Sequence, residues 1–482
     1  MRFNINGTPL EVPDGHSLAA EALAHGIPTR RSVSGESRGP LCGMGVCFEC
    51  RATVDGVAHQ LACQTFAGIP AAPGASIATD LLIIGAGPAG LAAAAAASAN
   101  GVSVTMADDN PTPGGQIWRG NNPPIANGVQ FLPLTRVVDA PQPGELIATR
   151  AGAIVRLHYK RLLLATGARE RFLPFPGWTL PHVLGAGGLQ ALVKAGLPIA
   201  KKRIVIAGTG PLLVAVAAYM RDHGASIVAL CDQASASAQA KFLTQLPFSK
   251  WGQGISLARS LRGVRPRAGT WPVAAGLGSV AFNDGRTVSC DYLAVGYHLV
   301  PNTELAQLLG CATQNGFVVV NDRQQTTVAD VYCAGEPTAI GGIDLAQAEG
   351  EIAGLAIAGA AAPRALLDRR DQFRRFAERL ARVTELRPEL RRLPQPETII
   401  CRCEDVTQSQ LAGASGTRSE AAQGLPPMNN WRAAKLHTRC GMGPCQGRTC
   451  APALEFLYGF APPPPRPPIF PAPIATLEES LP

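Results

Sequence analysis

The cysteines of this chain are gathered into two groups, one near each end, and this uneven placement constrains the fold more than any other feature. Nine of the thirteen cysteines belong to the two groups, and the other four are scattered singly. Thiols at such close spacing are typical of metal ligands or of disulfides. The sequence shows no signal-peptide pattern ahead of the first group, which argues against disulfides because they persist in oxidising compartments.

The first group has the spacing C-x4-C-x2-C followed by a more distant cysteine, and it consists of Cys42, Cys47, Cys50 and Cys63. A loop of this kind wraps three thiolates around one side of an iron-sulfur cluster while the remote cysteine closes the other side. A zinc site is the alternative, but zinc knuckles favour two C-x2-C-like pairs. The pattern therefore predicts a 2Fe-2S cluster held by these four thiolates.

Residues 1–78 resemble a plant-type 2Fe-2S ferredoxin domain of β-grasp fold. We expect a hairpin of residues 2–5 and 9–12 around Asn6-Gly7, and a helix capped by Ser17 that runs through His25. The short gap before Cys63 is closer to the form found in the iron-sulfur subunits of dehydrogenases than to photosynthetic ferredoxins.

The net charge of +8 and the pI near 8.9 come largely from arginines between Arg364 and Arg392. These arginines alternate with acidic residues above an apolar repeat at helical spacing: Phe373, Phe376, Leu380 and Val383. This pattern favours a solvated helix or a contact between subunits over nucleic-acid binding. With 482 residues, the chain is long enough for roughly three domains.

Residues 81–97 are apolar enough to raise the question of a membrane span. The glycines inside this stretch indicate a strand, a loop and a helix instead, so we expect no transmembrane segment. Reduced cluster thiols suit the cytoplasm, with a peripheral position at the inner membrane left open.

A dinucleotide-binding pattern follows the first cysteine group. A strand over residues 80–84 leads into a glycine loop, an alanine-rich helix that ends at Gly101, and a second strand over residues 102–107 that ends at Asp108. In such a loop the first glycine makes the turn, the second admits a pyrophosphate to the helix N-terminus, the third lets helix and strand pack, and the acid binds ribose. The loop predicts contacts to the dinucleotide from Gly85, Gly87, Pro88, Ala89 and Gly90, with Asp108 as the ribose ligand.

Two later segments resemble those of two-dinucleotide flavoproteins. Residues 162–168 (LLLATGA) are similar to the segment where the chain crosses between nucleotide domains, and residues 327–336 (TVADVYCAGE) are similar to the second FAD segment. The resemblance implies FAD contacts from Thr166, Gly167, Gly335 and Glu336. Most such flavoproteins have aspartate at the position of Glu336. An empty nucleotide fold is the alternative to bound FAD.

The second glycine loop departs from the pattern. The run Gly208-Thr209-Gly210-Pro211 follows a strand, but Leu213 stands at the position of the third glycine. Counted from the first glycine of each loop, Cys231 takes the position of Asp108, and Asp232 lies one residue later. A one-residue slip on a strand turns a side chain to the opposite face, so we expect Asp232 to miss a ribose. We predict a degenerate NAD(P)-type domain without productive hydride transfer, and NAD(P) occupancy is left open.

The four scattered cysteines, Cys231, Cys290, Cys311 and Cys333, lie in apolar contexts and are expected to be small buried hydrophobes. No redox-active pair of cysteines accompanies either glycine loop. A glutathione- or thioredoxin-reductase mechanism is therefore unsupported.

The second cysteine group consists of Cys401 and Cys403 followed by Cys440, Cys445 and Cys450. The segments CRCED (401–405) and TRCGMGPCQGRTC (438–450) resemble the small helical 2Fe-2S domain named for bacterioferritin-associated ferredoxin. The resemblance implies the ligands Cys401, Cys403, Cys445 and Cys450, because the family has a C-x4-C pair, and leaves Cys440 as a neighbouring thiol or alternative ligand. Zinc stays open, since thiolate counts alone do not separate the metals. A histidine ligand, His437, is a further alternative.

The order of these parts looks like the small cluster subunit of hydrogen cyanide synthase fused head to tail with the large flavoprotein subunit of the same enzyme. It also resembles the α subunits of opine oxidases and D-hydroxyproline dehydrogenase and, more distantly, sarcosine oxidase α. The most specific local matches are residues 438–450 and 113–119 (PGGQIWR), and the latter adds Gly115 and Gln116 to the expected FAD contacts.

The resemblance implies an α/β fold with a two-dinucleotide-binding, glutathione-reductase-like flavoprotein core between two 2Fe-2S domains, one β-grasp and one small and helical. We expect the following limits: 1–78 for the ferredoxin-like domain, 79–170 with 300–362 for the FAD domain, 171–299 for the degenerate NAD(P)-type domain, 363–396 for an arginine-rich helical linker, 397–460 for the second cluster domain and 461–482 for a proline-rich tail.

The resemblance also implies a function. We expect the electron-transferring α subunit of a heteromeric dehydrogenase or oxidase for glycine or a secondary-amine amino acid, with FAD and two 2Fe-2S clusters. In that family, amine oxidation is attributed to a β subunit of the D-amino-acid-oxidase type, so the catalytic residues of this chain stay unknown. A self-contained NAD(P)H:acceptor oxidoreductase and a non-catalytic electron carrier are the alternatives.

Overall fold

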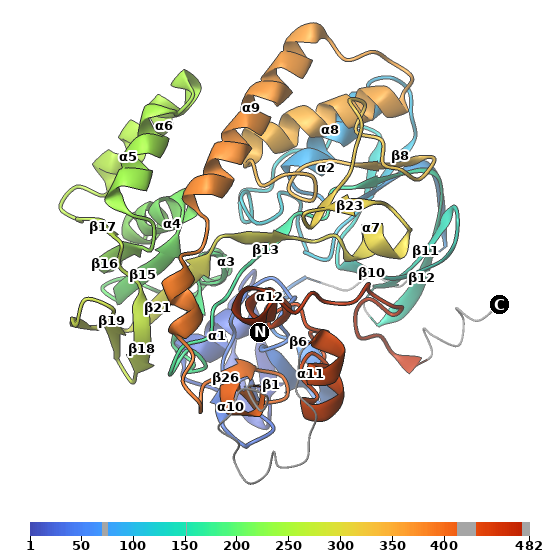
Figure 1. The fold of residues 1–482 in the computed structure, drawn as a ribbon. Helices are drawn as coiled ribbons and strands as arrows, with labels where there is room; N and C mark the ends of the chain where they lie inside the picture. Colours follow the sequence, from blue (N-terminus) through green and yellow to red (C-terminus); the bar gives the residue numbers. More distant parts are fainter. Residues whose placement is uncertain (70–75, 151, 412–429, 475–482) are drawn as a thin grey trace. The chain divides into compact units, whose positions relative to one another are not determined.

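The chain forms two compact units, each built from segments that are far apart in the sequence. The computed structural model describes residues 1–69, 76–150, 152–411 and 430–474. Unit 1 consists of Met1–Gly68, Glu170–Leu299 and Arg382–Pro463, and unit 2 of Ile69–Arg169, Val300–Ala381 and Pro464–Pro482. The short strands β13 (Ala168–Glu170) and β22 (Leu299–Pro301) mark two of the places where the chain passes between units (Figure 1).

The N-terminal part of unit 1 is a four-stranded sheet in the order β2-β1-β5-β6. Its elements are β1 (Arg2–Ile5), β2 (Thr8–Glu11), α1 (Leu18–Ala24), the small pair β3 (Arg30–Arg31) and β4 (Ser37–Arg38), β5 (Arg51–Val54) and β6 (Val57–Leu61). The Ser17 hydroxyl accepts from the Ala20 N–H and caps α1. The expected hairpin and capped helix are thus confirmed.

A five-stranded parallel sheet in the order β14-β21-β15-β16-β17 forms the middle part of unit 1. Its strands are β14 (Val183–Gly185), β15 (Arg203–Thr209), β16 (Ser226–Asp232), β17 (Arg267–Ala268) and β21 (Tyr292–Tyr297). The helices are α3 (Ala186–Lys194), α4 (Pro211–Asp222), α5 (Ala236–Thr244) and α6 (Phe248–Ser260), and a small sheet contains β18 (Pro272–Gly276), β19 (Ser279–Phe282) and β20 (Thr287–Ser289). Ile5 and Leu18 share one apolar core with Leu189 and Ile204, so the first two parts of unit 1 fold around a continuous interior.

The C-terminal part of unit 1 is short and largely helical. It contains η1 (Pro388–Arg392), β26 (Ile399–Cys401), β27 (Val406–Thr407), α10 (Gln408–Leu411), α11 (Trp431–Thr438) and α12 (Ala451–Tyr458). The N-terminus of α12 follows directly after Cys450, and β26 ends at Cys401. Two cysteines of the second group therefore lie at the ends of regular elements.

Unit 2 is built around a seven-stranded mixed sheet in the order β10-β11-β12-β7-β8-β9, with β25 paired to β12. Its strands are β7 (Ile77–Ile84), β8 (Val104–Ala107), β9 (Val129–Leu132), β10 (Thr135–Gln142), β11 (Glu145–Arg150), β12 (Ala153–Leu164) and β25 (Val331–Cys333). The helices are α2 (Pro88–Ser98), α7 (Glu304–Leu308), α8 (Ile343–Ile357) and α9 (Arg364–Val383), and β23 (Thr313–Gln314) pairs with β24 (Phe317–Val318). The strand expected over residues 80–84 begins three residues earlier, and the following helix ends at Ser98 instead of Gly101.

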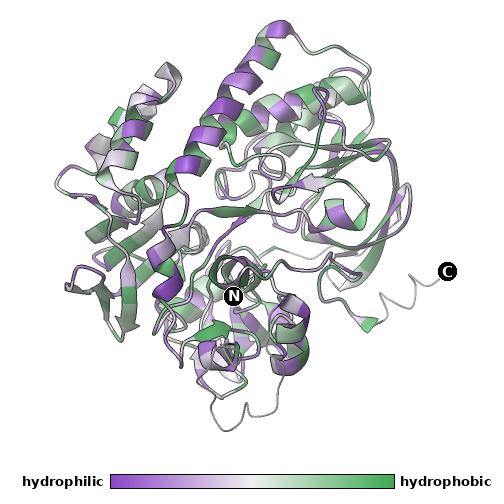
Figure 2. Ribbon diagram, viewed as in Figure 1, coloured by the Kyte–Doolittle hydropathy of each residue, from purple (hydrophilic) through white to green (hydrophobic). Residues whose placement is uncertain are grey.

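Helices α2 and α8 pack closely because glycines remove side chains from their contact. A Cβ on Gly350 would lie 2.1 Å from the Ala89 carbonyl oxygen, and one on Gly354 would lie 2.4 Å from that of Ala93. Both helices are largely apolar in Figure 2. Among the helices that the structure describes, none combines the length and apolarity needed to cross a membrane.

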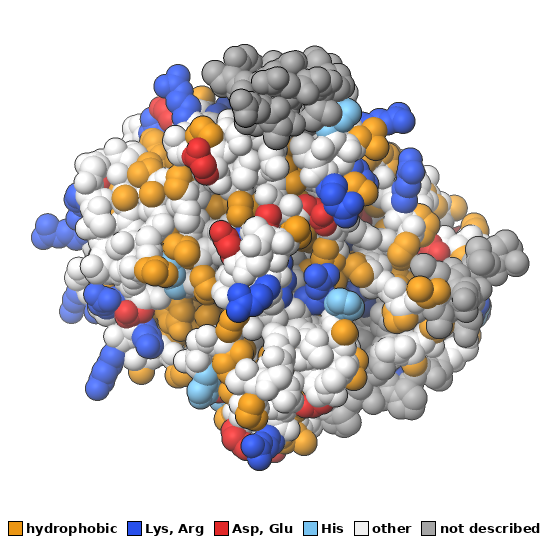
Figure 3. Space-filling view, turned by 90° about the horizontal axis from the view of Figure 1, so that it is seen from below, with side chains coloured by type: hydrophobic (Ala, Val, Ile, Leu, Met, Phe, Trp, Pro, Cys, Tyr) orange, Lys and Arg blue, Asp and Glu red, His pale blue; other side chains and the backbone are white. Residues whose placement is uncertain are grey.

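Helix α9 is amphipathic as predicted, with Phe373, Phe376 and Leu380 buried and charged residues on its other face (Figure 2). Two of its arginines depart from the expected solvated face. Arg370 is buried and pairs with Asp322 and Asp371, and Arg374 pairs with the fully buried Glu349 at 2.9 Å. On the face shown in Figure 3, lysine and arginine side chains are scattered among acidic and apolar groups.

The described residues of the proline-rich tail contribute to the core of unit 2. The Ile469 N–H donates to the Val138 carbonyl at 2.8 Å, and the Ile469 side chain is buried in the apolar cluster beneath β10 to β12. The adjacent Phe470 ring lies 4.9 Å from the Arg136 guanidinium. This segment therefore lies on the sheet of unit 2.

Candidate redox centres

The four cysteines of the first group converge as two close pairs. Cys42 hydrogen-bonds to Cys47, and the Sγ atoms of Cys50 and Cys63 are 3.1 Å apart. All four are buried. Backbone N–H groups point at the sulfurs over 3.2–3.4 Å, donated by Met44 and Cys47 to Cys42, by Gly45 to Cys63 and by Glu49 to Cys47. Two thiol pairs with donors aimed at sulfur fit a 2Fe-2S cluster.

Backbone contacts hold this loop against the N-terminus of α3. The Gly185 N–H donates to the Leu41 carbonyl at 2.9 Å, and a Cβ on Gly43 would lie 2.8 Å from the Gly188 carbonyl oxygen. Gly43 has φ +61°, a conformation that glycine adopts without steric cost. The glycine beside Cys42 therefore allows both the turn and the close approach.

All five cysteines of the second group converge as well. The Sγ atoms of Cys401, Cys440 and Cys450 lie within 4.8 Å of one another, and Cys403 hydrogen-bonds to Cys445. A Cβ on Gly443 would lie 2.2 Å from the Cys403 Cβ, so only glycine fits between the later thiols. His437 lies in the last turn of α11. The structure groups Cys440 with the predicted ligands Cys401 and Cys450, and it pairs the other two predicted ligands, Cys403 and Cys445, with each other.

The first glycine loop has the geometry that a pyrophosphate requires. A Cβ on Gly85 would lie 2.1 Å from the Ala165 carbonyl oxygen, and one on Gly90 would lie 1.9 Å from that of Gly85. Gly87 caps α2 and Pro88 begins it. A Cβ on Gly115 would lie 3.0 Å from the Gly87 Cα, so the segment of Gly115 and the half-buried Gln116 borders the loop. Bare backbone at a helix N-terminus suits a phosphate group.

Asp108 lies at the end of β8 and faces this loop. One carboxylate oxygen accepts from the Ala86 N–H at 2.6 Å, and the other accepts from the backbone and side chain of Asn110. Burial, with a smaller contribution from Asp109, raises the pKa of Asp108 to about 6. Asp109 is paired with Arg136 at 3.0 Å instead. Asp108, and not Asp109, is therefore the carboxylate that contacts the glycine loop.

The two later flavin-type segments border the same loop. The Thr166 hydroxyl donates to the Asn302 carbonyl at 2.6 Å, and Asn302 donates back to the Thr166 carbonyl at 2.9 Å. The neighbouring Gly167 carbonyl accepts from the Asn302 N–H at 3.0 Å. A Cβ on Gly335 would lie 3.0 Å from the Ala89 Cβ. These segments therefore lie around the start of α2.

Glu336 offers an unused buried acceptor in this site. Its Oε1 accepts from the Gly342 N–H at 3.0 Å, while Oε2 is buried and has no hydrogen-bond partner among the described residues. Burial raises the pKa of Glu336 to about 7. A flavin ribityl hydroxyl is the kind of donor that satisfies such an oxygen. The residues present therefore fit FAD.

An ion pair that the sequence analysis did not predict supports the segment of Glu336. Glu349 accepts from Arg374 through one oxygen and from the Gly335 N–H and Thr338 hydroxyl through the other. Glu349 is fully buried. The available signal was an acid at helical spacing from Leu345 and Ile352, because acids on an apolar helix face are normally paired when they are buried.

At the second glycine loop, the orientation of the Asp232 carboxylate differs from the prediction. Strand β16 contains a register shift, since Ile204 pairs with Ile227 but Val205 pairs with Ala229. This irregularity absorbs the extra residue and restores the side-chain alternation. The Asp232 carboxylate therefore faces the loop, accepting from the Gly210 N–H at 3.1 Å and the Ala234 N–H at 2.8 Å.

The same loop is covered by a segment of its own chain. A Cβ on Gly210 would lie 2.8 Å from the Thr384 Cγ2. Gln233, which is fully buried, donates to the Glu385 carbonyl at 2.9 Å and accepts from the Arg387 N–H at 3.1 Å. Thr384 thus occupies the side of the second glycine that a pyrophosphate approaches in a dinucleotide site.

The four scattered cysteines are buried and unpaired by disulfides. Burial raises the pKa of Cys231 to about 12 and that of Cys290 to about 11. Such thiols are protonated at neutral pH and behave as small apolar side chains. The prediction that these four side chains are buried is thus confirmed.

Two family models match the chain. Residues 79–351 match the model described as pyridine nucleotide-disulphide oxidoreductase, and residues 1–80 match that of a 2Fe-2S iron-sulfur cluster binding domain. The A subunit of opine oxidase from Agrobacterium tumefaciens (strain Ach5) is 33% identical over 430 residues, which cover 77% of this chain and 84% of that protein. The HcnB subunit of hydrogen cyanide synthase from Pseudomonas protegens is 30% identical over 436 residues, which cover 77% of this chain and 89% of that protein.

This chain belongs to the family of HcnB and the opine oxidase A subunit. The resemblance identified from the sequence is confirmed, and the chain is an oxidoreductase of the flavin and iron-sulfur type. L-proline dehydrogenase from P. horikoshii is similar in fold, with a TM-score of 0.69 and 18% identity over 98% of this chain and 97% of that chain. The predicted α/β flavoprotein fold with an N-terminal 2Fe-2S domain is confirmed as well.

Proposed function

We propose that this relative of HcnB and of the opine oxidase A subunit is the electron-transferring α subunit of a heteromeric dehydrogenase. Its substrate would be glycine or a secondary-amine amino acid of the opine, hydroxyproline or sarcosine type. The observation that carries the proposal is the presence, in one chain, of a FAD-type site and two convergent sets of buried thiols. The names of the relatives, which are subunits of opine oxidase and hydrogen cyanide synthase, support a multi-subunit enzyme.

Each group has a distinct task in this proposal. Bound flavin supplies the conversion between two-electron chemistry at a C–N bond and one-electron transfer. Gly87 and Pro88 at the start of α2 bind its pyrophosphate, Asp108 accepts from ribose, and Glu336 accepts from the ribityl chain. The two cysteine groups hold clusters that each carry one electron, with Cys401, Cys403, Cys445 and Cys450 as the ligands of the second.

The amine-oxidising pocket is assigned to a partner. We propose a flavoprotein β subunit of the D-amino-acid-oxidase type, and a cytoplasmic location, with attachment to the inner membrane through an electron acceptor left open. The chain should be purified alone and with its co-expressed genomic neighbours. The isolated chain should contain FAD and iron but lack amino-acid dehydrogenase activity, which should appear only in the complex. Amino-acid dehydrogenase activity of the chain alone would contradict the proposed role as an electron-transferring subunit.

A self-contained NAD(P)H:acceptor reductase is the second candidate, and the orientation of Asp232 toward the second glycine loop favours it. The Thr384 side chain against Gly210 opposes it. Anaerobic mixing with NADH or NADPH separates the two candidates. Slow or absent bleaching of the flavin supports the proposal of an electron-transferring subunit, whereas rapid bleaching supports the reductase.

A further inference from the structure

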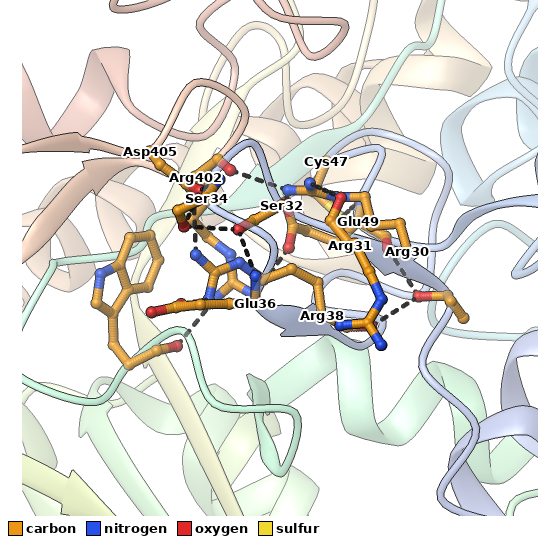
Figure 4. Close-up of polar contacts among 12 residues, drawn as sticks. Arg30, Arg31, Ser32, Ser34, Glu36, Arg38, Cys47, Glu49, Arg402 and Asp405 are labelled. Carbon is orange, nitrogen blue, oxygen red and sulfur yellow. Dashed lines mark hydrogen bonds and ion pairs between the residues drawn. The ribbon is translucent and has the colours of Figure 1, made fainter.

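A buried ion pair joins the loops that carry the two cysteine groups. Glu49 lies between Cys47 and Cys50, and Arg402 lies between Cys401 and Cys403. The Arg402 Nη2 donates to Glu49 Oε2 at 2.9 Å, and the two side chains are only 2% and 1% exposed (Figure 4). Both residues belong to unit 1.

Further contacts hold this pair in a single arrangement. The Arg30 Nη2 donates to Glu49 Oε1 at 2.6 Å and to the Arg402 carbonyl at 2.9 Å. The Arg402 Nη1 donates to the Trp178 carbonyl at 2.9 Å, and its guanidinium lies 5.0 Å from the Trp178 ring centroid. Trp178 is itself fixed by the Ile399 carbonyl, which accepts from its indole at 2.6 Å. The pair is therefore rigid and screened from water.

One donor of Arg402 is left for a group at the second cysteine site. The Arg402 Nε is buried and has no hydrogen-bond acceptor among the described residues. A buried N–H without an acceptor is costly. Because Arg402 stands between Cys401 and Cys403 in the sequence, cluster sulfur held at the second site is the kind of acceptor that would satisfy it. Arg402 thus fits a role toward both cluster sites.

We propose that the Glu49 and Arg402 pair links the two cluster sites, so that single electrons pass directly between them and each site influences the reduction potential of the other. The inference rests on the proposed second cluster. In each transfer one cluster is oxidised by one electron and the other is reduced by one, with no bond made or broken. The path is short because the ion pair connects residues that directly adjoin Cys50, Cys401 and Cys403.

The charges of the pair predict the direction in which each cluster potential should shift when one of the two residues is replaced. Net charge and hydrogen bonds to sulfur set the potentials of such clusters, and buried charges act with little screening by solvent. The Glu49 carboxylate disfavours reduction of a nearby cluster, and the Arg402 guanidinium favours it. Removing the Glu49 carboxylate leaves Arg402 and Arg30 without their shared acidic partner, and removing the Arg402 guanidinium leaves Glu49 with Arg30 alone. The two changes therefore alter the local charge in opposite senses and should move the potentials in opposite directions.

The test uses the full chain and EPR-monitored redox titration of each cluster. Glu49→Gln should move both cluster potentials to more positive values, and Arg402→Gln should move both to more negative values. The double variant should recover most of the wild-type potentials, and Arg402→Lys should stay close to wild type. The fully reduced wild type should show a magnetic interaction between clusters that disappears in Cys47→Ser.

Arg38→Gln is the matched control. Arg38 is buried like Arg402 and also joins the N-terminal part to the C-terminal part, through Asp405 at 2.9 Å, but it does not lie between cluster thiols. Its removal should leave the potentials near their wild-type values. If Arg402→Gln fails to load the second cluster, the upward shift in Glu49→Gln still tests the proposal, since that variant retains every thiol and Arg402.

Three results would overturn the inference. Shifts of the same sign in Glu49→Gln and Arg402→Gln, shifts of equal size in Arg38→Gln, or no magnetic interaction in a wild type with two clusters would each show that the pair is only a structural contact. Iron analysis separates this from failure of the proposed function. A wild type with a single 2Fe-2S cluster would overturn the second cluster assignment itself.

Discussion

Two opposing effects act on the protonation state of Asp108. Its burial raises its pKa to about 6, while a ribose hydroxyl needs the ionised carboxylate as acceptor. In the flavin-free protein, the folded state holds this proton while the unfolded chain releases it near pH 4, so this group's contribution to the free energy of unfolding falls as the pH rises from about 4 to about 6. The affinity for FAD should rise over the same pH range, because the ribose hydroxyl needs the ionised carboxylate.

We therefore expect FAD affinity to rise with pH through about 6. Asp108→Asn should flatten that part of the pH profile, although Glu336, whose pKa is about 7, adds a second dependence above it. Loss of a hydrogen bond to a charged acceptor, about 1.5–3 kcal/mol, corresponds to roughly 10- to 100-fold weaker binding. Fluorescence titration of the apoprotein with FAD between pH 5 and 8 measures both effects. An unchanged profile in Asp108→Asn would exclude Asp108 as the ribose ligand.

Cys440 and Cys450 are both close enough to Cys401 to compete for one coordination position. The family pattern favours Cys450, so Cys440→Ser should retain both EPR signals of the reduced protein. Cys445→Ser should lose the second signal, because the Cys445 thiol is the hydrogen-bond partner of Cys403 in the described part of the chain. Loss of the second signal in Cys440→Ser, together with its retention in Cys450→Ser, would exchange the two assignments.

Residues 384–387 form the segment that covers the second glycine loop. Two hydrogen bonds between its backbone and the Gln233 side chain, together with the contact of the Thr384 methyl group, hold it there. We expect the wild type to bind ADP-ribose poorly. The double variant Gln233→Ala with Thr384→Ala releases all three contacts and should bind ADP-ribose at least tenfold more tightly in calorimetry. Thr244→Ala, at the exposed end of α5, is the control and should behave as wild type. Equal, tight binding by wild type and double variant would mean that the segment does not close the site.

Local patterns could be predicted, and contacts between distant segments could not. Both glycine loops, the Ser17 cap and the C-x4-C-x2-C and C-x-C runs were evident because spacing within a few residues defines them. The orientation of Asp232 was wrongly predicted because an irregularity in β16 cannot be counted from sequence. The pairing of Glu49 with Arg402 and the placement of Thr384 on Gly210 depend on tertiary structure, which a single sequence does not display.

At the scale of the whole molecule, the two thiol sets have separate ligands even though one ion pair joins their loops. Cys47→Ser should remove one 2Fe-2S EPR signal and leave the other, and Cys445→Ser should do the converse. Iron content should fall by about half in each variant, because each cluster holds two irons. Loss of both signals from either single substitution would show that the two sites assemble as one.

The segments of the two units alternate along the sequence, and this order has a consequence for the synthesis and folding of the chain. Each unit is composed of three separate segments, and the last segment of unit 1 ends at Pro463, just before the last segment of unit 2 begins. Chains are synthesised from the N-terminus, so contacts between early and late segments form only after the late segments have been made. The first cysteine group leaves the ribosome long before Arg402 can pair with Glu49. Delivery of iron and sulfur to the first site can thus precede synthesis of the second cysteine group, whereas neither unit can form all its contacts until its last segment has been made.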